Sequence, residues 1–366
     1  MNLETIARLA GVSRSTVSRV VNDDPRVSDA VRARVESIIR DHHFQPNAAA
    51  RSLASRRTRI LGLRIPDAAE TFVGYPYFAQ LTQGVSDACN AIEHDLLLMM
   101  ENDNLPETVE KLYRRVIRGR HVDGVVVGSS HIADPLVERL HAERFPMIVM
   151  GHYPTLPDVS FVDVDNRNGV REAVRHLIEH GCRRIATITG QGHIRHAIDR
   201  TAGYQEALAE AGLPIDPDLR HDGVFSEAGG YRAMKSMLEA VGSNPPDGAF
   251  IASDAMAVGA RFALDEAGLR VPEDIKVIGF DGLDRYEINW PSLSTVRQPV
   301  TQQGAQAVNA LHNRIEHPND PPIQTWLPTT LIRRGSCGCS VDLSAQPSWQ
   351  VDCTTDPLLA EAAADD

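Results

Sequence analysis

Residues 14–19 read Arg-Ser-Thr-Val-Ser-Arg, so two guanidinium groups enclose three hydroxyls. A guanidinium donates two parallel hydrogen bonds to the edge of a guanine, and hydroxyls contact bases or phosphate oxygens. Helical spacing directs Val17, Val20 and Val21 inward and leaves these polar side chains outside. The segment therefore has the chemistry of a helix that reads the major groove of DNA.

The sequence contains parts of other functional motifs, for metal binding, dinucleotide binding and catalysis, but none of them is complete. Cys337-Gly338-Cys339 supplies two thiols without further paired Cys or His nearby in the sequence, short of the four ligands of a structural zinc ion. Gly190-Gln191-Gly192 lacks the third glycine of a dinucleotide-binding loop, and no Ser, Cys or carboxylate pair stands in a recognisable catalytic motif. We therefore expect no metal, no cofactor and no enzymatic activity. The remaining histidines, such as His42 and His43, are expected at the surface or in the core.

Short helices must position residues 14–19. Apolar residues at helical spacing predict a helix over residues 3–10, and Gly11-Val12-Ser13 interrupts it. Ser13 is placed to cap the second helix, which stops at Asn22-Asp23-Asp24-Pro25, and a third helix follows Ser28. Three helices with a glycine-containing turn predict a helix-turn-helix unit.

The charge is uneven along the chain. The first 59 residues hold 11 Arg, no Lys and 6 acidic residues, whereas the net charge of all 366 residues is −12. A basic end suits a polyanion, and an acidic body limits nonspecific adsorption to DNA. The alternative for the basic end is a merely solvated pair of helices. Five Cys without disulfide spacing indicate a reducing cytoplasm, and neither a signal peptide nor a membrane span of ~20 apolar residues is recognisable.

From residue 60 onward, apolar strand-like runs alternate with amphipathic helical stretches, which is typical of parallel α/β sheets. Gly181, Gly212 and Gly268 are expected to end helices. A break near residues 160–166 divides the strands into two lobes, with ligands expected at the carboxyl ends of the strands. The expected strands are residues 60–65, 96–100, 124–127, 147–150, 185–189, 249–252 and 276–280.

Three N-terminal motifs, GVSRSTVSRVVND, VSDAVRARVESII and FQPNAAARSLA, resemble in this order the DNA-binding region of the LacI/GalR (lac repressor) family. The resemblance continues through DVDNRNGVREAVRHLIEHGCRRIATITG, DRTAGYQEAL, IASDAMAVGA, LRVPEDIKVIGFD and PSLSTVRQP, and it covers residues 3–339. It implies an α/β protein with an all-α headpiece and a two-lobed, periplasmic-binding-protein-like sensor. The expected domains are a headpiece (1–46), a hinge helix and linker (47–59), an effector-binding and dimerisation domain (60–339) and a disordered acidic tail (340–366).

The resemblance also implies the DNA contacts. Arg14, Ser15 and Arg19 would read bases, while Thr16 and Ser18 would hold phosphates. Leu53, in the hinge helix, would wedge into the minor groove and kink the duplex; the alternative is that it packs on the sensor domain. The full predicted set is Arg14, Ser15, Thr16, Ser18, Arg19, Asn22, Asn47, Ala50, Arg51 and Leu53.

Matching positions place the main effector contacts at Phe78, Arg200, Phe225 and Asp281. An aromatic face stacks on a ring, Arg donates a fork of hydrogen bonds, and a carboxylate accepts from hydroxyl or ring N–H groups. The alternative for both phenylalanines is a place in the core. Further rim candidates are Tyr77, Ser129, His196, Ser253, Asp254 and Trp290. The family more usually has Asn where Ser253 stands, and the loop over residues 66–76 is longer than in its relatives.

These observations predict a cytoplasmic homodimer that binds a palindromic operator and is released from it by a sugar. A purine-type corepressor is the alternative effector, because Phe78 and Phe225 could enclose a flat ring. A sugar receptor without a DNA role is disfavoured by the arginine-rich N-terminus. A carbohydrate-modifying enzyme would need a catalytic pair that the sequence does not offer. The tail lacks leucine heptads, so no tetramer-forming helix is expected.

Overall fold

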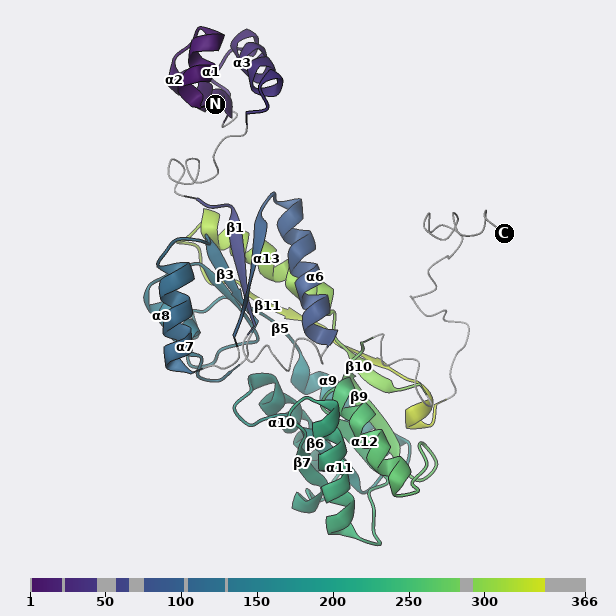
Figure 1. The fold of residues 1–366 in the computed structure, drawn as a ribbon. Helices are drawn as coiled ribbons and strands as arrows, with labels where there is room; N and C mark the ends of the chain where they lie inside the picture. Colours follow the sequence, from purple (N-terminus) through teal and green to yellow (C-terminus); the bar gives the residue numbers. More distant parts are fainter. Residues whose placement is uncertain are drawn as a thin grey trace, which may run out of the picture.

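The computed structural model describes residues 2–21, 24–44, 57–65, 76–101, 105–128, 131–283 and 292–339 (Figure 1). The acidic tail over residues 340–366 lies outside these ranges, so its predicted disorder stays a prediction. Within them, no helix is both long enough and apolar enough to cross a membrane.

The N-terminal unit consists of α1 (Leu3–Ala10), α2 (Arg14–Val21) and α3 (Asp29–Asp41). Gly11 ends α1 with a φ of 64°, and the hydroxyl oxygen of Ser13 accepts from the backbone N–H of Thr16 at 3.1 Å. The predicted helix boundaries and this cap are confirmed. Ser28 occupies the N-cap position of α3, although its hydroxyl makes no capping bond. Buried side chains from all three helices, including Ile6, Val17 and Val35, form a small core of their own.

Two six-stranded sheets form the body, with the strand orders β11-β5-β4-β3-β1-β2 and β12-β10-β9-β8-β6-β7 (Figure 1). All paired strands run parallel except β10 and β12, which are antiparallel. The first sheet contains β1 (Ile60–Ile65), β2 (Asp95–Met100), β3 (Gly124–Val127), β4 (Met147–Met150), β5 (Phe161–Val164) and β11 (Gln324–Leu327). The second contains β6 (Ile185–Thr189), β7 (Arg220–Asp222), β8 (Gly248–Ile251), β9 (Lys276–Asp281), β10 (Ser294–Arg297) and β12 (Thr330–Ile332).

Helices cover the faces of each sheet. The first sheet is accompanied by α6 (Pro76–Ala91), α7 (Pro106–Leu112), the π-helical η1 (Tyr113–Ile117), α8 (Pro135–Ala142) and α13 (Val300–Glu316). The second is accompanied by α9 (Asn166–Glu179), α10 (Arg195–Glu210), η2 (Pro217–Leu219), α11 (Glu227–Val241), α12 (Asp254–Glu266) and η4 (Gly335–Cys337). The helices α6 and α13 lie side by side (Figure 1), and Gly84 permits this because a Cβ there would stand 2.1 Å from the carbonyl oxygen of Thr301.

The described chain passes between the two sheets three times: from β5 to α9, from β10 to α13 and from β11 to β12. The predicted break at residues 160–166 marks the first of these passages, and it contains the strand β5. All seven predicted strands are confirmed, with ends that agree within one residue. The strands β7, β11 and β12 were not predicted because they are short edge strands, and β10 because its buried residues include Ser294 and Thr295. Positive φ angles at Gly181, Gly212 and Gly268 confirm the predicted helix ends.

A buried ionic triad lies near the carboxyl end of the first sheet. Arg64 on β1 is fully buried, and its Nε and Nη1 atoms donate to Glu101 at 2.7 Å and to Asp134 at 2.5 Å. The second oxygen of Asp134 also accepts from the backbone N–H groups that start α8. Since each charge is out of water, the triad holds only while all its members are present.

Replacing Arg64 with Met should lower the free energy of unfolding by roughly 3–5 kcal/mol, because two carboxylates would stay buried without a cation. Urea denaturation followed by circular dichroism measures the change. Arg59→Met is the matched control, since Arg59 pairs with Glu93 at the surface at 3.6 Å, and it should cost far less. Equal losses for the two variants would contradict a structural role for the triad.

A second buried carboxylate, Asp254, joins the start of α12 to the segment after β9. One oxygen accepts from the backbone N–H groups of Gly282 at 2.8 Å and Leu283 at 3.0 Å, and the other is bonded to the Thr295 hydroxyl at 2.7 Å. Burial, followed by the nearby negative charge of Asp281, raises the pKa of Asp254 from 3.8 to about 8.

This raised pKa predicts a pH dependence. The stability that Asp254 gains by holding its proton in the folded state is complete below 3.8 and is lost as the pH rises through about 8. Asp254→Asn removes the charge and keeps an acceptor for both N–H groups, and the Thr295 hydroxyl, which donates to Asp254, can rotate to accept from the new amide. Its melting temperature relative to wild type should therefore rise as the pH increases from 4 to 8. The exposed Asp265→Asn on the same helix is the control. A melting curve for Asp254→Asn that parallels wild type across this range would refute the assignment.

Candidate DNA-reading and effector sites

The helix α2 presents the polar face that the sequence predicts. Arg14, Ser15 and Arg19 are exposed, Thr16 and Ser18 are half-buried, and the valines behind them are packed in the core. The hydroxyl of Ser13 is bonded to those of Ser15 at 2.7 Å and Thr16 at 2.9 Å, so the start of the helix has a fixed arrangement of hydroxyls.

Two other arginines, Arg26 and Arg32, form hydrogen bonds with Asp24 in the turn after α2. Arg26 donates twice to the carboxylate of Asp24, which holds the pKa of that carboxyl far below its usual range. Arg32 donates to the backbone carbonyl of Asp24 at 2.7 Å and ties α3 to the turn. The backbone N–H of Asp24 donates to the carbonyl of Arg19 at 2.9 Å, so the turn and α3 are joined to α2, while Arg14 and Arg19 remain exposed.

Several predicted site residues lie outside the described ranges, and their roles stay predictions. They are Asn22, Asn47, Ala50, Arg51 and Leu53 of the DNA-contact set, and Ser129 and Trp290 of the effector set. The long loop over residues 66–76 also falls there, except for its last residue.

Arg200 and Asp281 form the centre of the predicted effector site. They come from the first turns of α10 and the end of β9, both are buried, and Nη1 of Arg200 lies 3.6 Å from Oδ1 of Asp281. Arg200 also donates to Asn166 at 2.9 Å and to the carbonyl of Ala252 at 2.6 Å. Its guanidinium carbon lies 3.6 Å from the centre of the Phe280 ring. The arginine is thus held by contacts from several elements of one lobe.

Asp281 begins a relay of side chains that leads to the first lobe. Gln298 donates to Asp281 at 2.7 Å, Gln303 donates to Gln298 at 3.0 Å, and Tyr77 on α6 donates to Gln303 at 3.4 Å. Burial and then the charge of Asp281 raise the pKa of Tyr77. The backbone of Asp281 has a φ of 115°, a conformation that L-residues rarely adopt and that is found at functional sites.

The predicted aromatic contacts occur as two pairs. Tyr77 and Phe78 meet edge to face at 5.2 Å between ring centres on α6, and His196 and Phe225 meet at 5.0 Å in the second lobe. Burial and the charge of Arg200 lower the pKa of His196 well below 6.5, so its imidazole is neutral at pH 7. All four residues are half-buried, and Phe78 and Phe225 also pack against core clusters, which agrees in part with the alternative that they belong to the core.

Gly190 gives the Gly-Gln-Gly segment a structural explanation. A Cβ at this position would stand 1.9 Å from the ring of Phe225, so only glycine leaves room for that ring. Phe225 itself has a φ of 54°, which directs it there from the segment before α11. The segment therefore supports a candidate binding residue instead of a dinucleotide.

Ser253 and Asp254 are fully used by the protein itself. The hydroxyl of Ser253 caps α12 by accepting from the N–H of Met256, and Asp254 bonds the three donors described above. Their effector contacts stay predictions. The hydrogen bonds within the protein already account for the burial of both side chains, without a contact to an effector.

Three further polar residues near the site, Asn166, Gln298 and Gln303, were not predicted as site residues. Asn166 and Gln298 stand at two of the three passages between the sheets, and Gln303 is buried on α13. Asn166 and Gln298 carry a sequence signal, since they lie in the quoted motifs that begin DVDN and end VRQP, whereas Gln303 lies in none.

The two lobes also touch directly. His131 and Ile194 form an isolated β-bridge, and the N–H of Ile132 donates to the carbonyl of His193 at 3.0 Å. His152 is bonded to Asp163 at 2.8 Å and lies 3.8 Å from Asp199 across the lobes. Polar groups from both lobes thus meet around the predicted site.

Comparison with known proteins identifies both parts of the chain. The family model described as bacterial regulatory proteins, lacI family, matches residues 2–47, and a periplasmic binding protein-like domain matches residues 174–337. The chain is 36% identical over 336 residues to the HTH-type transcriptional regulator CelR of Thermobifida fusca, covering 91% of this chain and 97% of that protein. It is also 36% identical over 336 residues to the HTH-type transcriptional repressor PurR of Erwinia tasmaniensis, covering 91% and 96%.

Solved structures agree with this result. A CelR–cellobiose complex has a TM-score of 0.72 and 35% identity, covering 92% of this chain and 99% of that one. The lac repressor dimer bound to operator and the anti-inducer ONPF has a TM-score of 0.79 over the same shares at 24% identity, which supports the fold. The helix-turn-helix unit, the two-lobed sensor and these relatives together establish that the chain belongs to the LacI family of bacterial DNA-binding transcriptional regulators.

Proposed function

We propose that this regulator is a homodimeric repressor that a sugar releases from a palindromic operator, with a β-linked disaccharide such as cellobiose as the first effector to test. The relay from Arg200 through Asp281, Gln298 and Gln303 to Tyr77 is the observation that carries the proposal. Fork-donating, carboxylate and amide groups suit vicinal hydroxyls, and the aromatic pairs suit the faces of sugar rings. The 35% identical CelR–cellobiose complex supports the choice of ligand.

The relay also suggests how the ligand signal travels. It joins side chains of both lobes at the passages between the sheets, so a ligand that rearranges it would change the angle between the lobes. We infer that this moves the hinge segments of a dimer, residues 47–59 in each chain, apart. Effector and operator would then oppose each other by equal factors, because coupling between binding equilibria is reciprocal.

At the DNA, Arg14, Ser15 and Arg19 would contact bases and Thr16 and Ser18 phosphates. Two-fold symmetry of the protein would match a palindromic site, since one headpiece reads only a half-site. Leu53 would act as the minor-groove wedge, together with Asn47, Ala50 and Arg51 of the hinge. The domain boundaries at residues 46, 59 and 339 belong to this proposal.

Cellobiose should raise the melting temperature of the wild-type protein in proportion to the logarithm of its concentration. Asp281→Asn should weaken that response by tenfold or more in apparent affinity, ~1.4 kcal/mol, because the amide lacks the charge that accepts strongly from hydroxyls. The melting temperature of each variant with ligand is compared with its own ligand-free value, so a change in basal stability does not affect the measured shift.

The exposed Asp265→Asn is the control and should respond like wild type. The same thermal-shift panel includes glucose, maltose and purine bases. A purine response without any sugar response would replace the sugar proposal with the corepressor alternative. A normal cellobiose response in Asp281→Asn would show that Asp281 and the relay it begins do not take part in binding the sugar.

Arg14→Ala should relax base preference at one operator position by roughly 1–3 kcal/mol, because a bidentate contact to a base edge would be lost. Selection from a random DNA pool, followed by affinity measurements at two salt concentrations, gives the preference. Arg40→Ala on the exposed side of α3 should leave it unchanged. Equal weakening on all sequences by both variants would argue against base reading by Arg14.

A further inference from the structure

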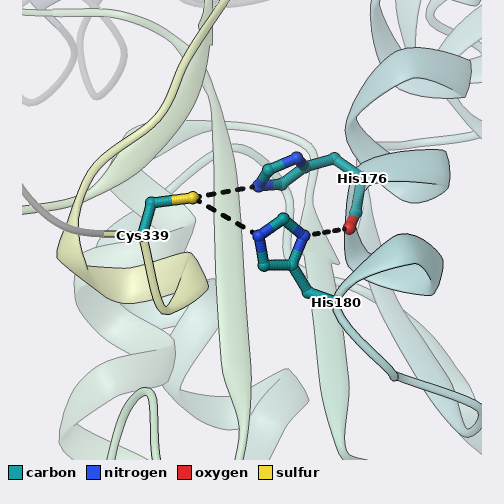
Figure 2. A group of neighbouring side chains, drawn as sticks. All are labelled: His176, His180 and Cys339. Atoms are coloured by element: carbon teal, nitrogen blue, oxygen red, sulfur yellow. Dashed lines mark hydrogen bonds between the residues drawn. The ribbon is translucent and has the colours of Figure 1, made fainter.

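A cluster of imidazoles and thiols lies in the second lobe, apart from the relay described above. His176 lies in the last turn of α9 and His180, four positions later, is the C-cap residue of that helix, so both lie at the same helix end. Figure 2 shows both rings directed at the sulfur of Cys339, which follows η4 near the end of the described chain. The contact joins residues 163 positions apart, which is why the sequence did not reveal it.

The distances between these atoms match those between ligands of one metal ion. Sγ of Cys339 lies 3.5 Å from Nε2 of His176 and 3.6 Å from Nε2 of His180. In a tetrahedral zinc site, Zn–N bonds of ~2.05 Å and Zn–S bonds of ~2.3 Å place nitrogen and sulfur ligands ~3.5 Å apart. The potential ligand atoms of His176, His180 and Cys339 all lie within 4.8 Å of one another.

Cys337 is the candidate fourth ligand, although its sulfur is not among the three ligand atoms that all lie within 4.8 Å of one another. Its side chain is fully buried, and its Sγ lies 3.3 Å from Nε2 of His176. Both thiols are free of disulfides, and they are held next to each other by the short turn of η4 and Gly338. Two thiols and two imidazoles are the donor set of a Cys2His2 zinc centre.

The outer contacts orient at least one imidazole for coordination. Nδ1 of His180 lies 2.9 Å from the carbonyl oxygen of His176, an acceptor, so Nδ1 carries the proton and donates it (Figure 2). The lone pair of His180 is therefore on Nε2, the atom that faces Cys339. A backbone carbonyl that fixes the tautomer in this way is the usual outer partner of a zinc-bound histidine.

Hydrogen bonds among the two thiols and the two imidazoles would explain their close approach less fully than a shared metal ion does. Cys337 already donates to the carbonyl of Arg334 at 3.2 Å. The single thiol proton of Cys339 can serve only one of the two Nε2 atoms that face it. One metal ion, in contrast, would satisfy the ligand atoms of His176, His180 and Cys339 at once, and the thiol of Cys337, which lies beside His176, would complete the set once its side chain shifts.

We propose that His176, His180 and Cys339 bind a zinc ion, that Cys337 turns in as its fourth ligand, and that the ion fastens the end of α9 to the segment after β12. Binding would form two Zn–N and two Zn–S bonds and release the two thiol protons to solvent. The site is separate from the effector relay, but both use α9, since Asn166 at the start of this helix bonds Arg200. Metal binding would thus hold a helix on which the proposed effector site also depends.

The test uses the full-length protein, purified with reducing agent, stripped with a chelator and titrated with Co²⁺ and then Zn²⁺. One equivalent of Co²⁺ per chain should produce visible absorption of tetrahedral intensity and a thiolate-to-cobalt charge-transfer band. Zn²⁺ should displace Co²⁺ and remove both signals. Metal analysis of protein that has not been stripped should find one zinc per chain.

Cys339→Ser and His180→Gln should each weaken binding by more than the ~10–100-fold that loss of an outer partner costs. The controls are Cys89→Ala, a buried thiol in the first lobe, and His221→Gln, a histidine outside the cluster. Circular dichroism and operator binding show that each variant is folded, and they are independent of the metal signal. Absence of cobalt absorption in folded wild-type protein, or equal binding by the ligand variants and controls, would overturn the proposal.

Discussion

The buried contact between Arg200 and Asp281 is the interaction on which the arrangement of the sensor domain depends. A guanidinium and a carboxylate that are both out of water must neutralise each other and satisfy their remaining hydrogen-bonding groups. Because Nη1 of Arg200 and Oδ1 of Asp281 lie 3.6 Å apart, other groups complete their hydrogen bonds. Arg200 donates to Asn166 and to the carbonyl of Ala252, and Asp281 accepts from Gln298. Because these partners come from different elements, the position of the pair depends on the lobe as a whole.

That dependence gives the site its connection to the rest of the molecule. Asn166 and Gln298 stand where the chain passes from one sheet to the other, so the charges are fixed by the joints between the lobes. A ligand that competes for Arg200 or Asp281 must therefore disturb residues at those joints. If the proposed function holds, the fold would need no separate device to couple ligand binding to lobe orientation, because the proposed binding groups are bonded to the residues at these joints.

Buried charge is handled differently elsewhere in the chain. Arg64 is held between two carboxylates within the first lobe, and Asp254 relies on backbone N–H groups and a neutralising proton. Neither arrangement reaches across the lobes. The His–Cys cluster is again local to the second lobe, and it would add a metal clamp at the opposite end of the helix that begins with Asn166.

The sequence by itself determined the features that depend on near neighbours. The three N-terminal helices follow from helical spacing, from the stop at Gly11 and from the cap at Ser13, and the central strands follow from continuous apolar runs. Arg200 and Asp281 were predicted as effector contacts through resemblance and residue chemistry. Only the tertiary structure decided that Gln298 and Gln303 join them to Tyr77, that Ser253 and Asp254 turn inward, and that Cys339 meets two histidines. The reason is physical: periodicity and capping act over a few residues, whereas these contacts join positions that sheet topology alone brings together.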